Sequence, residues 1–378
     1  MMRSQNLDGA ICSLFGTSVV RIFLAIFIFS GLSAFSGVAI AQVIGSGEMR
    51  AHYIDVGQGS ATLLEFSCGA VLIDAGAEGP VTQAGLIRYL DRFFARRTDL
   101  NRTLQSVIIT HAHKDHNVGL MEVLTKFQVL NYIDNGLRKG SGRFNQNWAQ
   151  DNAGRLGMTY ANYSYDKIKV NGKVNGHTDG VIDPVNCQGV DPVISVLSGR
   201  FDAPVGGMTV SELEGNGNLH SLVVKVVFGK SSFLFTGDLE EKAMHTVAKY
   251  YMGSGTLNSD VWQVSHHGSY NGVTMGWLKE VSPKFAVISC GKWDSGKVGA
   301  KDRFNTYTFG HPRIAALDML QASIKEERPL LDSVVAFYGQ REKHRNYKVT
   351  KNIYCNAWDG NIVIRAFDNG KYEVVDKW

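Results

Sequence analysis

The stretch Thr110-His111-Ala112-His113-Lys114-Asp115-His116 places four side chains that can bind a metal within six residues. It directly follows residues 106–109, a short apolar segment with β-branched residues that predicts a buried strand. A loop at a strand end can turn alternate side chains apart, so the first two histidines can meet at one ion while Asp115 and His116 face a second. The stretch therefore predicts a two-metal site at the end of a strand.

Two further ligand candidates also stand at the ends of predicted strands. Asp238 comes shortly after the apolar residues 233–235, and the pair His266-His267 comes shortly after residues 261–264. Taken alone, the aspartate has an ordinary explanation as a helix cap, and the histidine pair as part of a turn. Their joint recurrence at strand ends favours one common site.

The rest of the chain predicts strands and helices in a repeating order. Residues 49–56 and 61–66 predict a pair of strands, residues 70–73 a third strand and residues 81–97 an amphipathic helix. Strands followed by strand–helix alternation occur twice along the chain, which favours two packed sheets with helices outside. Residues 368–370, Asp-Asn-Gly, predict a hairpin near the C-terminus.

The composition is that of a globular protein. The 378 residues are 44% hydrophobic and 20% charged, enough for one large core or two ordinary ones. The net charge of +4 is too small for a protein dedicated to coating nucleic acid. The five cysteines are scattered and form no CxxC motif, which excludes a framework of closely spaced cysteines.

The N-terminus predicts export from the cytoplasm. Arg21 precedes eight apolar residues, and small residues lead to Ala39-Ile40-Ala41. A basic flank, an apolar core and an A-x-A site indicate a signal peptide over residues 1–41, and hence a periplasmic or secreted protein. The alternative is a membrane anchor formed by residues 22–41. An oxidising compartment permits disulfides, but the cysteine spacing does not say which residues pair.

Short motifs along residues 49–327 together resemble those of one family. They are Asp55-Val56-Gly57-Gln58-Gly59, Leu72-Ile73-Asp74-Ala75-Gly76, the HxHxDH stretch at 111–116, Phe235-Thr236-Gly237-Asp238, His266-His267-Gly268-Ser269 and Gly310-His311-Pro312. On these motifs the chain is identified as a member of the metallo-β-lactamase fold hydrolases. It resembles their ComEC-like branch, which is related to the extracytoplasmic domain of DNA-uptake competence proteins. The branch commonly has an acidic residue after Gly-Gln-Gly, where this chain has Ser60.

The resemblance implies an α+β fold, a four-layer αββα sandwich with a dinuclear site at one edge. The hydrolase domain would cover residues 42–330, with an insertion near residues 136–218. Residues 331–378 would form a β-rich C-terminal extension packed on the domain.

The resemblance also implies a set of metal ligands. These are His111 and His113 for the first metal, Asp115 and His116 for the second, Asp238 as a bridge, His266 to close the second site, and His220 as a further ligand. His220 stands near the place where the superfamily supplies one more histidine and where the branch often has asparagine. The cofactors would be two divalent ions, with zinc favoured and manganese or iron also compatible with histidine and aspartate ligands.

The expected chemistry is hydrolysis by a metal-bound hydroxide, because zinc lowers the pKa of a coordinated water to about 7. Asp115, His267 and His311 are the candidate catalytic residues, and the two histidines titrate in a range suited to protonating a leaving oxygen. Asp74 is expected to orient the ligand loop.

The substrate prediction is a phosphodiester or another anionic molecule, with extracellular nucleic acid as a candidate partner. Lys292, Lys297, Lys301 and Arg303 lie in one loop and suit phosphate oxygens. If the signal peptide is cleaved, no stable membrane partner is expected. The alternatives are hydrolysis of a cyclic amide or ester, including β-lactams, and a non-catalytic metal-binding module.

Overall fold

A computed structural model describes residues 43–171, 175–293 and 304–375 of the chain. The predicted signal peptide and the greater part of the predicted basic loop therefore lie outside the described residues. The described part forms one compact unit built around two large sheets.

The first sheet has eight strands in the order β16-β15-β1-β2-β3-β4-β5-β6. Its strands from β3 to β6 are parallel to their neighbours, and the remaining pairs are antiparallel. The bounds are β1 Glu48–Tyr53, β2 Thr62–Glu65, β3 Ala70–Ile73, β4 Thr103–Ile108, β5 Gln128–Asp134, β6 Thr159–Asn162, β15 Ile362–Phe367 and β16 Tyr372–Val375.

The second sheet has six strands in the order β14-β11-β10-β9-β8-β7. Its strands β9, β10, β11 and β14 run parallel to one another, whereas β7 and β8 are antiparallel to their neighbours. The bounds are β7 Val193–Ser198, β8 Val223–Phe228, β9 Ser231–Phe235, β10 Val261–Gln263, β11 Phe285–Ile288 and β14 Ile353–Cys355. A separate two-stranded sheet pairs β12 (Glu327–Phe337) with β13 (His344–Lys351).

The two large sheets face each other across an apolar core. The ring of Tyr53 on β1 stacks against that of Phe235 on β9, with ring centres 6.3 Å apart. The rings of Phe66 and Phe228 lie 6.5 Å apart and belong to the same buried cluster. On β3, Val71 and Ile73 point into this core, whereas Ala70 and Leu72 point to the opposite face of the sheet. The strand is apolar throughout because both of its faces are covered.

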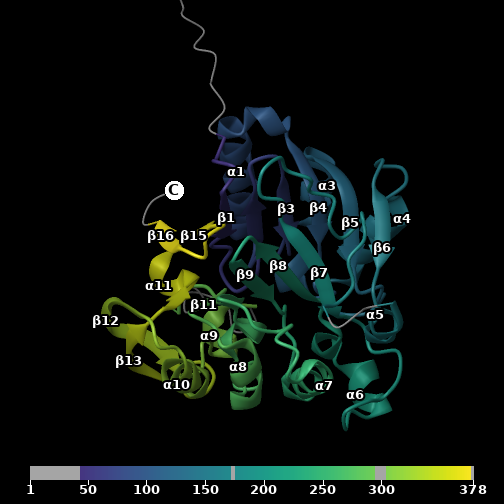
Figure 1. The fold of residues 1–378 in the computed structure, drawn as a ribbon. Coiled ribbons are helices and arrows are strands. Elements are labelled where there is room, and N and C mark those ends of the chain that lie inside the picture. Colours follow the sequence, from purple (N-terminus) through teal and green to yellow (C-terminus); the bar gives the residue numbers. More distant parts are fainter. Residues whose placement is uncertain (1–42, 172–174, 294–303, 376–378) are drawn as a thin grey trace, which may run out of the picture. The chain divides into compact units, whose positions relative to one another are not determined.

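Helices cover the outer faces of both sheets. The principal ones on the first sheet are α1 (Pro80–Arg96), α3 (Leu120–Lys126) and α4 (Arg143–Asn152), and those on the second are α7 (Glu241–Tyr251), α8 (Met275–Val281) and α10 (Ile314–Ser323). Figure 1 shows α7, α8 and α10 together on the side of the second sheet. The four layers are those of an αββα sandwich. The remaining short helices are η1 Thr98–Leu100, α2 Lys114–Asn117, α5 Tyr165–Asn171, α6 Val210–Gly215, η2 Gly217–His220, η3 Ser265–Gly268, α9 Thr306–Phe309 and α11 Asn356–Asp359.

Helix α1 illustrates how local sequence sets an element. It begins at Pro80, a residue whose fixed φ and missing N–H suit the first helical position. Leu86, Leu90 and Phe93 recur at helical spacing and are buried against the first sheet. The predicted helix over 81–97 therefore agrees with the structure to within one residue at each end.

The C-terminal segment supplies strands to both large sheets. Strand β14 is an edge strand of the second sheet, and β15 pairs directly with β1 of the first. The predicted hairpin at residues 368–370 joins β15 to β16, and Gly370 has a φ of 89° in this turn. Residues 353–375 thus complete both large sheets, because their strands supply hydrogen bonds that β1 and β11 would otherwise lack.

The predicted insertion at residues 136–218 is also partly built into the sandwich. Its strands β6 and β7 form one edge of the first and second sheets respectively. A disulfide between Cys68, beside β2, and Cys187 attaches the segment to the first sheet, and the bonded residues are 119 positions apart. This long-range cross-link settles a pairing that the cysteine spacing left open.

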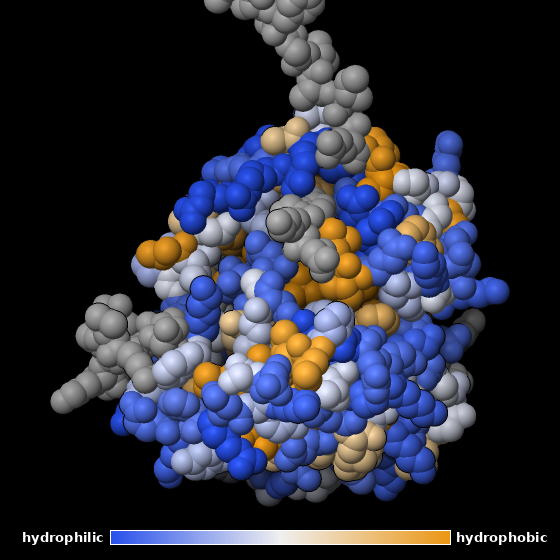
Figure 2. All heavy atoms as spheres, turned by 90° about the vertical axis from the view of Figure 1, so that its left-hand side faces the viewer, coloured by the Kyte–Doolittle hydropathy of each residue, from blue (hydrophilic) through white to orange (hydrophobic). Residues whose placement is uncertain are grey.

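The surface turned toward the viewer in Figure 2 is mostly hydrophilic, with hydrophobic residues in a few separate areas. Scattered apolar groups of this kind are ordinary on protein surfaces and assign no binding role to this face. Among the described helices, none combines the length and apolar character needed to cross a bilayer.

Candidate metal centre

Four neighbouring strands deliver the polar residues of the site. Asp74 follows β3, the HxHxDH stretch follows β4, Asp238 follows β9 and His267 follows β10. Within each sheet the strands concerned are parallel, β3 with β4 and β9 with β10. Their carboxyl ends therefore meet at the same edge of each sheet, and the two edges face each other across the sandwich.

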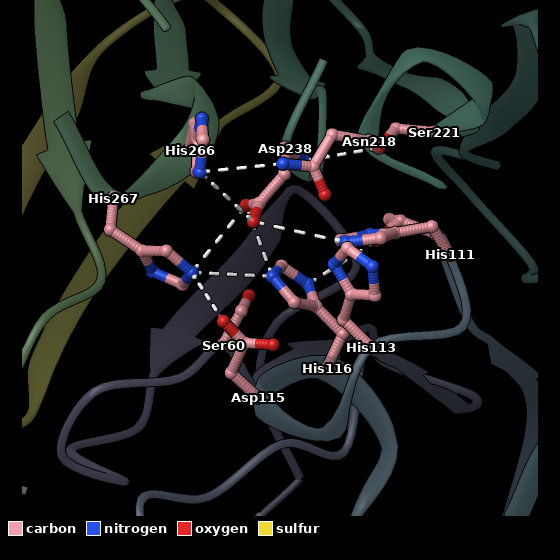
Figure 3. A network of polar contacts seen from close by, with 12 residues as sticks. Ser60, His111, His113, Asp115, His116, Asn218, Ser221, Asp238, His266 and His267 are labelled. Atoms are coloured by element: carbon pink, nitrogen blue, oxygen red, sulfur yellow. Dashed lines mark hydrogen bonds and ion pairs between the residues drawn. The ribbon is translucent and has the colours of Figure 1, made fainter. Parts of the chain in front are cut away.

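The side chains form two groups that share one carboxylate. His111, His113 and Asp238 form the first group, and Asp115, His116, Asp238 and His267 form the second. In each group the candidate ligand atoms all lie within 4.8 Å of one another. Figure 3 shows Asp238 between the imidazoles of both groups. All members are buried except His113, which is half-buried.

The arrangement of donor atoms fits divalent cations. Imidazole nitrogens face each other at 3.1 Å between His111 Nε2 and His113 Nδ1, and at 3.3 Å between His116 Nε2 and His267 Nε2. The buried Oδ1 atom of Asp115 accepts no hydrogen bond. Converging nitrogen lone pairs and a buried carboxylate oxygen are costly without a cation to share them. The two groups therefore have the composition and geometry of a site for divalent metal ions, and Asp238 belongs to both groups.

Hydrogen bonds to the outer ring nitrogens aim the histidines at the site. Nδ1 of His116 donates to Asp74 Oδ2 over 2.7 Å, and Nδ1 of His267 donates to the carbonyl of Ser289 over 2.6 Å. Asp74 also accepts from the backbone N–H of Thr110, at 2.8 Å. Each bond leaves Nε2 facing inward, which is the arrangement a metal ligand requires. Asp74 thus has the orienting position expected from the sequence.

Two tight turns hold the backbone of Asp115. The carbonyl of Asp115 accepts a hydrogen bond of 2.8 Å from the N–H of Ser60. A Cβ atom at Gly76 would lie 1.5 Å from this carbonyl oxygen, so only glycine fits there. The Gly-Gln-Gly-Ser and Asp-Ala-Gly motifs are therefore needed to let two strand ends approach the ligand loop. Ser60 Oγ in turn accepts from Gln263 Nε2 at 2.9 Å.

The backbone at the histidine pair is strained. His266 and His267 have φ values of 51° and 54°, and Gly268 follows with 71°. The left-handed region costs an ordinary residue roughly 1–3 kcal/mol, and such outliers concentrate at functional sites. Here the turn carries the ring of His267 into the second group, while His266 is left at the rim of the site with one fifth of its side chain exposed.

Burial and charge set the protonation of the site in opposite directions. Burial lowers the pKa of His111 well below its ordinary value, and the neighbouring His116 and His113 add to this effect. Burial also opposes the charged form of His116, but Asp238 and Asp74 outweigh it and raise the pKa of His116 well above its usual range. Burial likewise opposes the charged form of His267, but the carboxylates of Asp238 and Asp115 outweigh burial and raise its pKa to about 10.

The structure exchanges the predicted roles of His266 and His267. His267 rather than His266 belongs to the second ligand group, so the predicted use of His267 as a proton donor does not fit its position. His266 Nδ1 contacts Asn271 Oδ1 at 3.0 Å, and its Nε2 lies 3.9 Å from Asp238 Oδ2. The physical reason is the left-handed turn, which the sequence pattern alone does not reveal.

His220 is also not where the prediction placed it. Its Nδ1 accepts from the N–H of Phe201 at 3.1 Å, and its Nε2 donates to the carbonyl of Leu213 at 2.8 Å. Both ring nitrogens are therefore occupied, and His220 links helix α6 to the loop at Phe201 rather than joining either candidate ligand group. Asn218, two residues earlier, contacts His266 in Figure 3, with 3.4 Å between Asn218 Nδ2 and His266 Nε2, and its buried Oδ1 has no hydrogen-bond partner.

His311 is held as a neutral ring beside the site. Its ring stacks on that of His267 with centres 6.0 Å apart. Gln58 Nε2 donates to Nδ1 of His311 over 3.2 Å, and the hydroxyl of Thr306 donates to Gln58 Oε1, which sets the amide orientation. Burial, and then the charges of His266 and His267, lower the pKa of His311 well below its usual value. Its remaining proton therefore sits on Nε2.

Comparison with known proteins identifies the family to which the chain belongs. The family described as the metallo-beta-lactamase superfamily matches residues 54–292, a range that holds both ligand groups. The chain belongs to the metallo-β-lactamase superfamily. It is 28% identical to recombination protein 2 of Haemophilus influenzae over 65% of this chain and 24% of that protein. It is 26% identical to competence protein ComA of Neisseria gonorrhoeae over 63% of this chain and 26% of that protein.

These relatives and the motifs place the chain in the ComEC-like branch of the superfamily. It spans only about a quarter of the length of the curated relatives named here. Among solved structures, it is similar to the metallo-β-lactamase fold protein YhfI of Bacillus subtilis, with 13% identity and a TM-score of 0.36 over 64% of this chain and 85% of that one. It is also similar to human tRNase Z, short form, with 15% identity and a TM-score of 0.34 over 63% and 91%.

The two histidines of the strained turn can be told apart by metal content. We expect His267→Ala to weaken metal binding by more than about 100-fold, because it removes a member of the second candidate ligand group. His266→Ala should weaken it by no more than about tenfold, since that ring lies outside both ligand groups. Metal titration followed by elemental analysis measures both effects, with exposed His245→Ala as control. Equal losses at 266 and 267 would contradict this assignment.

Metal binding should release protons. In the metal-free protein at pH 7, His116 and His267 are protonated because their pKa values are raised, that of His267 to about 10. A metal binds only the neutral ring, so its affinity should rise with pH between 7 and about 9. Calorimetric titration in two buffers of different ionisation enthalpy counts the protons released; a heat that is the same in both buffers would count against the assignment.

The same pKa shift has a consequence for stability. A histidine whose pKa is raised in the folded state stabilises it fully below the unfolded value of about 6.5, and this contribution is lost as the pH approaches the folded value. The melting temperature of metal-free protein should therefore fall between about pH 6.5 and 10. Metal-loaded protein should be less sensitive in that range.

Proposed function

We propose that this protein is an exported, metal-dependent phosphodiesterase that binds two divalent ions and acts on nucleic acid. The observation that carries the proposal is the carboxylate of Asp238, shared by two ligand groups. Two ions held side by side suit phosphoryl transfer, since they can offset charge on both the attacking and the leaving oxygen. The similarity to proteins named for recombination and competence supports nucleic acid as the substrate.

The proposed centre divides the work between the ions and the protein. Divalent ions bound by the two groups would lower the pKa of a coordinated water and neutralise negative charge on the phosphate. The protein keeps the histidine rings in one tautomer through Asp74 and Ser289. It also excludes bulk water, because the ligands are buried between the two sheets.

His311 is proposed as a hydrogen-bond donor to a phosphoryl oxygen. The amide of Gln58 occupies Nδ1, so the ring offers the proton of Nε2. A neutral imidazole is a weak acid but a fixed donor, and a fixed donor stabilises charge that grows in the transition state. This role replaces the proton transfer that the sequence suggested for His311.

The proposed location is the periplasm or the extracellular space. The disulfide between Cys68 and Cys187 supports it, because such bonds are rare in the cytosol and common in exported proteins.

Purified protein loaded with Zn²⁺ or Mn²⁺ should hydrolyse bis-p-nitrophenyl phosphate and single-stranded DNA. His311→Ala should lower kcat about 10²–10³-fold without loss of bound metal, as expected when one fixed donor is removed. His245→Ala, an exposed histidine on α7, is the matched control. Nitrocefin tests the alternative of amide hydrolysis. The proposal is refuted if neither phosphodiester is cleaved, and turnover of nitrocefin alone would favour the alternative.

A further inference from the structure

A cavity of about 440 Å³ opens beside the first ligand group. His113 is part of its lining, so the cavity begins at the position proposed for the first metal. Lys139, Arg200 and His220 contribute further walls, and two acids, Asp202 and Glu214, line it as well. The cavity belongs to the segment of residues 136–218 for which the family resemblance supplied no role.

The loop that carries Lys139 is locked onto the ligand loop. The N–H of Gly142 donates to the carbonyl of Ala112 at 2.8 Å, and the N–H of Lys114 donates to Ser141 Oγ at 3.2 Å. A Cβ atom on Gly140 would lie 2.3 Å from the carbonyl oxygen of Ala112. Glycine is required for this contact, which places the backbone of Lys139 at a set distance from the metal ligands.

Most of the cations around this contact lack an acidic partner among the described residues. Arg200 is paired with Asp202 at 2.7 Å. In contrast, Lys114, Lys139 and Arg143 form no ion pair with any described residue, and all three are exposed. Lysine and arginine in this situation are free to meet phosphate oxygens, which they bind through charge-assisted hydrogen bonds.

We propose that this cavity, with Lys139 at its edge, binds the phosphate next to the one cleaved at the metal centre. The inference rests on the proposed function and extends it. It makes the substrate a strand with at least two neighbouring phosphates rather than an isolated phosphodiester. Glu214 faces the same cavity and opposes an anion there, so removing its charge should act in the opposite direction to removing Lys139.

The test compares a dinucleoside monophosphate with a trinucleoside diphosphate of the same base. Metal-loaded protein should cleave the substrate with two phosphates with the higher kcat/KM. Lys139→Ala should reduce this preference about five- to tenfold, less than a buried charge-assisted contact because Lys139 is exposed to solvent, and Glu214→Gln should increase it. The preference should also shrink at high salt. Lys348→Ala, an exposed lysine on β13, is the matched control.

A binding measurement separates this inference from the chemistry. A fluorescent phosphorothioate oligonucleotide, followed by anisotropy, should bind Lys139→Ala about five- to tenfold more weakly than wild type at equal metal content. Weakened binding without any turnover would uphold the cavity and reject the proposed reaction. Turnover with the same preference and affinity in wild type and Lys139→Ala would reject the cavity and leave the reaction standing.

A second, independent observation concerns Cys290 and Cys355. Both are buried, and their sulfur atoms lie 2.6 Å apart. Cys355 ends β14 and pairs in register with Ile288 of β11, two residues before Cys290. Ser289, between these two positions, accepts the hydrogen bond that orients His267. The pair therefore joins the C-terminal segment to the strand end that supports the second ligand group.

We infer that Cys290 and Cys355 form a second disulfide when the protein folds in an oxidising compartment. The two thiols lose two protons and two electrons as the S–S bond forms, and the disulfide of a thiol oxidoreductase is reduced to two thiols in exchange. The bond between Cys68 and Cys187 indicates that folding occurs where such an oxidant is present.

Peptide mapping of the exported protein tests this inference. Unreduced protein, alkylated under denaturing conditions and digested, should yield one linked peptide pair containing Cys290 and Cys355. The pair Cys68 and Cys187 in the same digest serves as the internal control. Recovery of Cys290 and Cys355 as separately alkylated peptides, beside an intact control pair, would overturn the inference.

Discussion

The structure depends on one electrostatic constraint, the gathering of four imidazoles and two carboxylates in a space nearly closed to water. Asp238 is central because it contacts both sets of rings, with His116 Nε2 at 3.0 Å and His111 Nε2 at 3.8 Å. Buried charges must be paired, and these side chains can be paired completely only by cations that they share. The pKa values of His116 and His267 are raised for the same reason: without metal ions, protons on these rings offset the charge of the nearby carboxylates.

The fold meets this constraint by bringing the ends of two sheets together. Parallel strands in each sheet present their carboxyl ends at one edge, and glycines such as Gly76 let the turns approach within contact distance. The C-terminal strand β14 pairs with β11. Ser289 directly follows β11, and its carbonyl accepts the hydrogen bond that orients His267. The C-terminal strand β14 therefore belongs to the sheet that carries the second candidate ligand group.

Membership of the superfamily accounts for the metal centre but leaves the choice of substrate to parts that surround it. In this protein those parts are the segment of residues 136–218 and the loop around His311. The first supplies a cavity whose wall includes the candidate ligand His113, and the second supplies the neutral ring of His311, which is held by Gln58 and Thr306. The first segment reaches the candidate ligands through backbone contacts, and the second through ring stacking of His311 on His267. Differences in these segments can therefore alter specificity without replacing the candidate ligands themselves.

The sequence by itself determined the strand ends, helix α1 and the ligand types, because periodicity and spacing are local properties. The HxHxDH stretch and Asp238 lie close together because each comes shortly after a buried strand, and the ends of these strands meet at one edge of the sandwich. Tertiary structure decided which of His266 and His267 faces the site, through a left-handed turn whose strain is supported by surrounding packing. It also gave both ring nitrogens of His220 backbone hydrogen-bond partners and joined Cys68 to Cys187. The strands β14, β15 and β16 were divided between the two large sheets. Each of these outcomes depends on contacts between residues far apart along the chain, which no local pattern records.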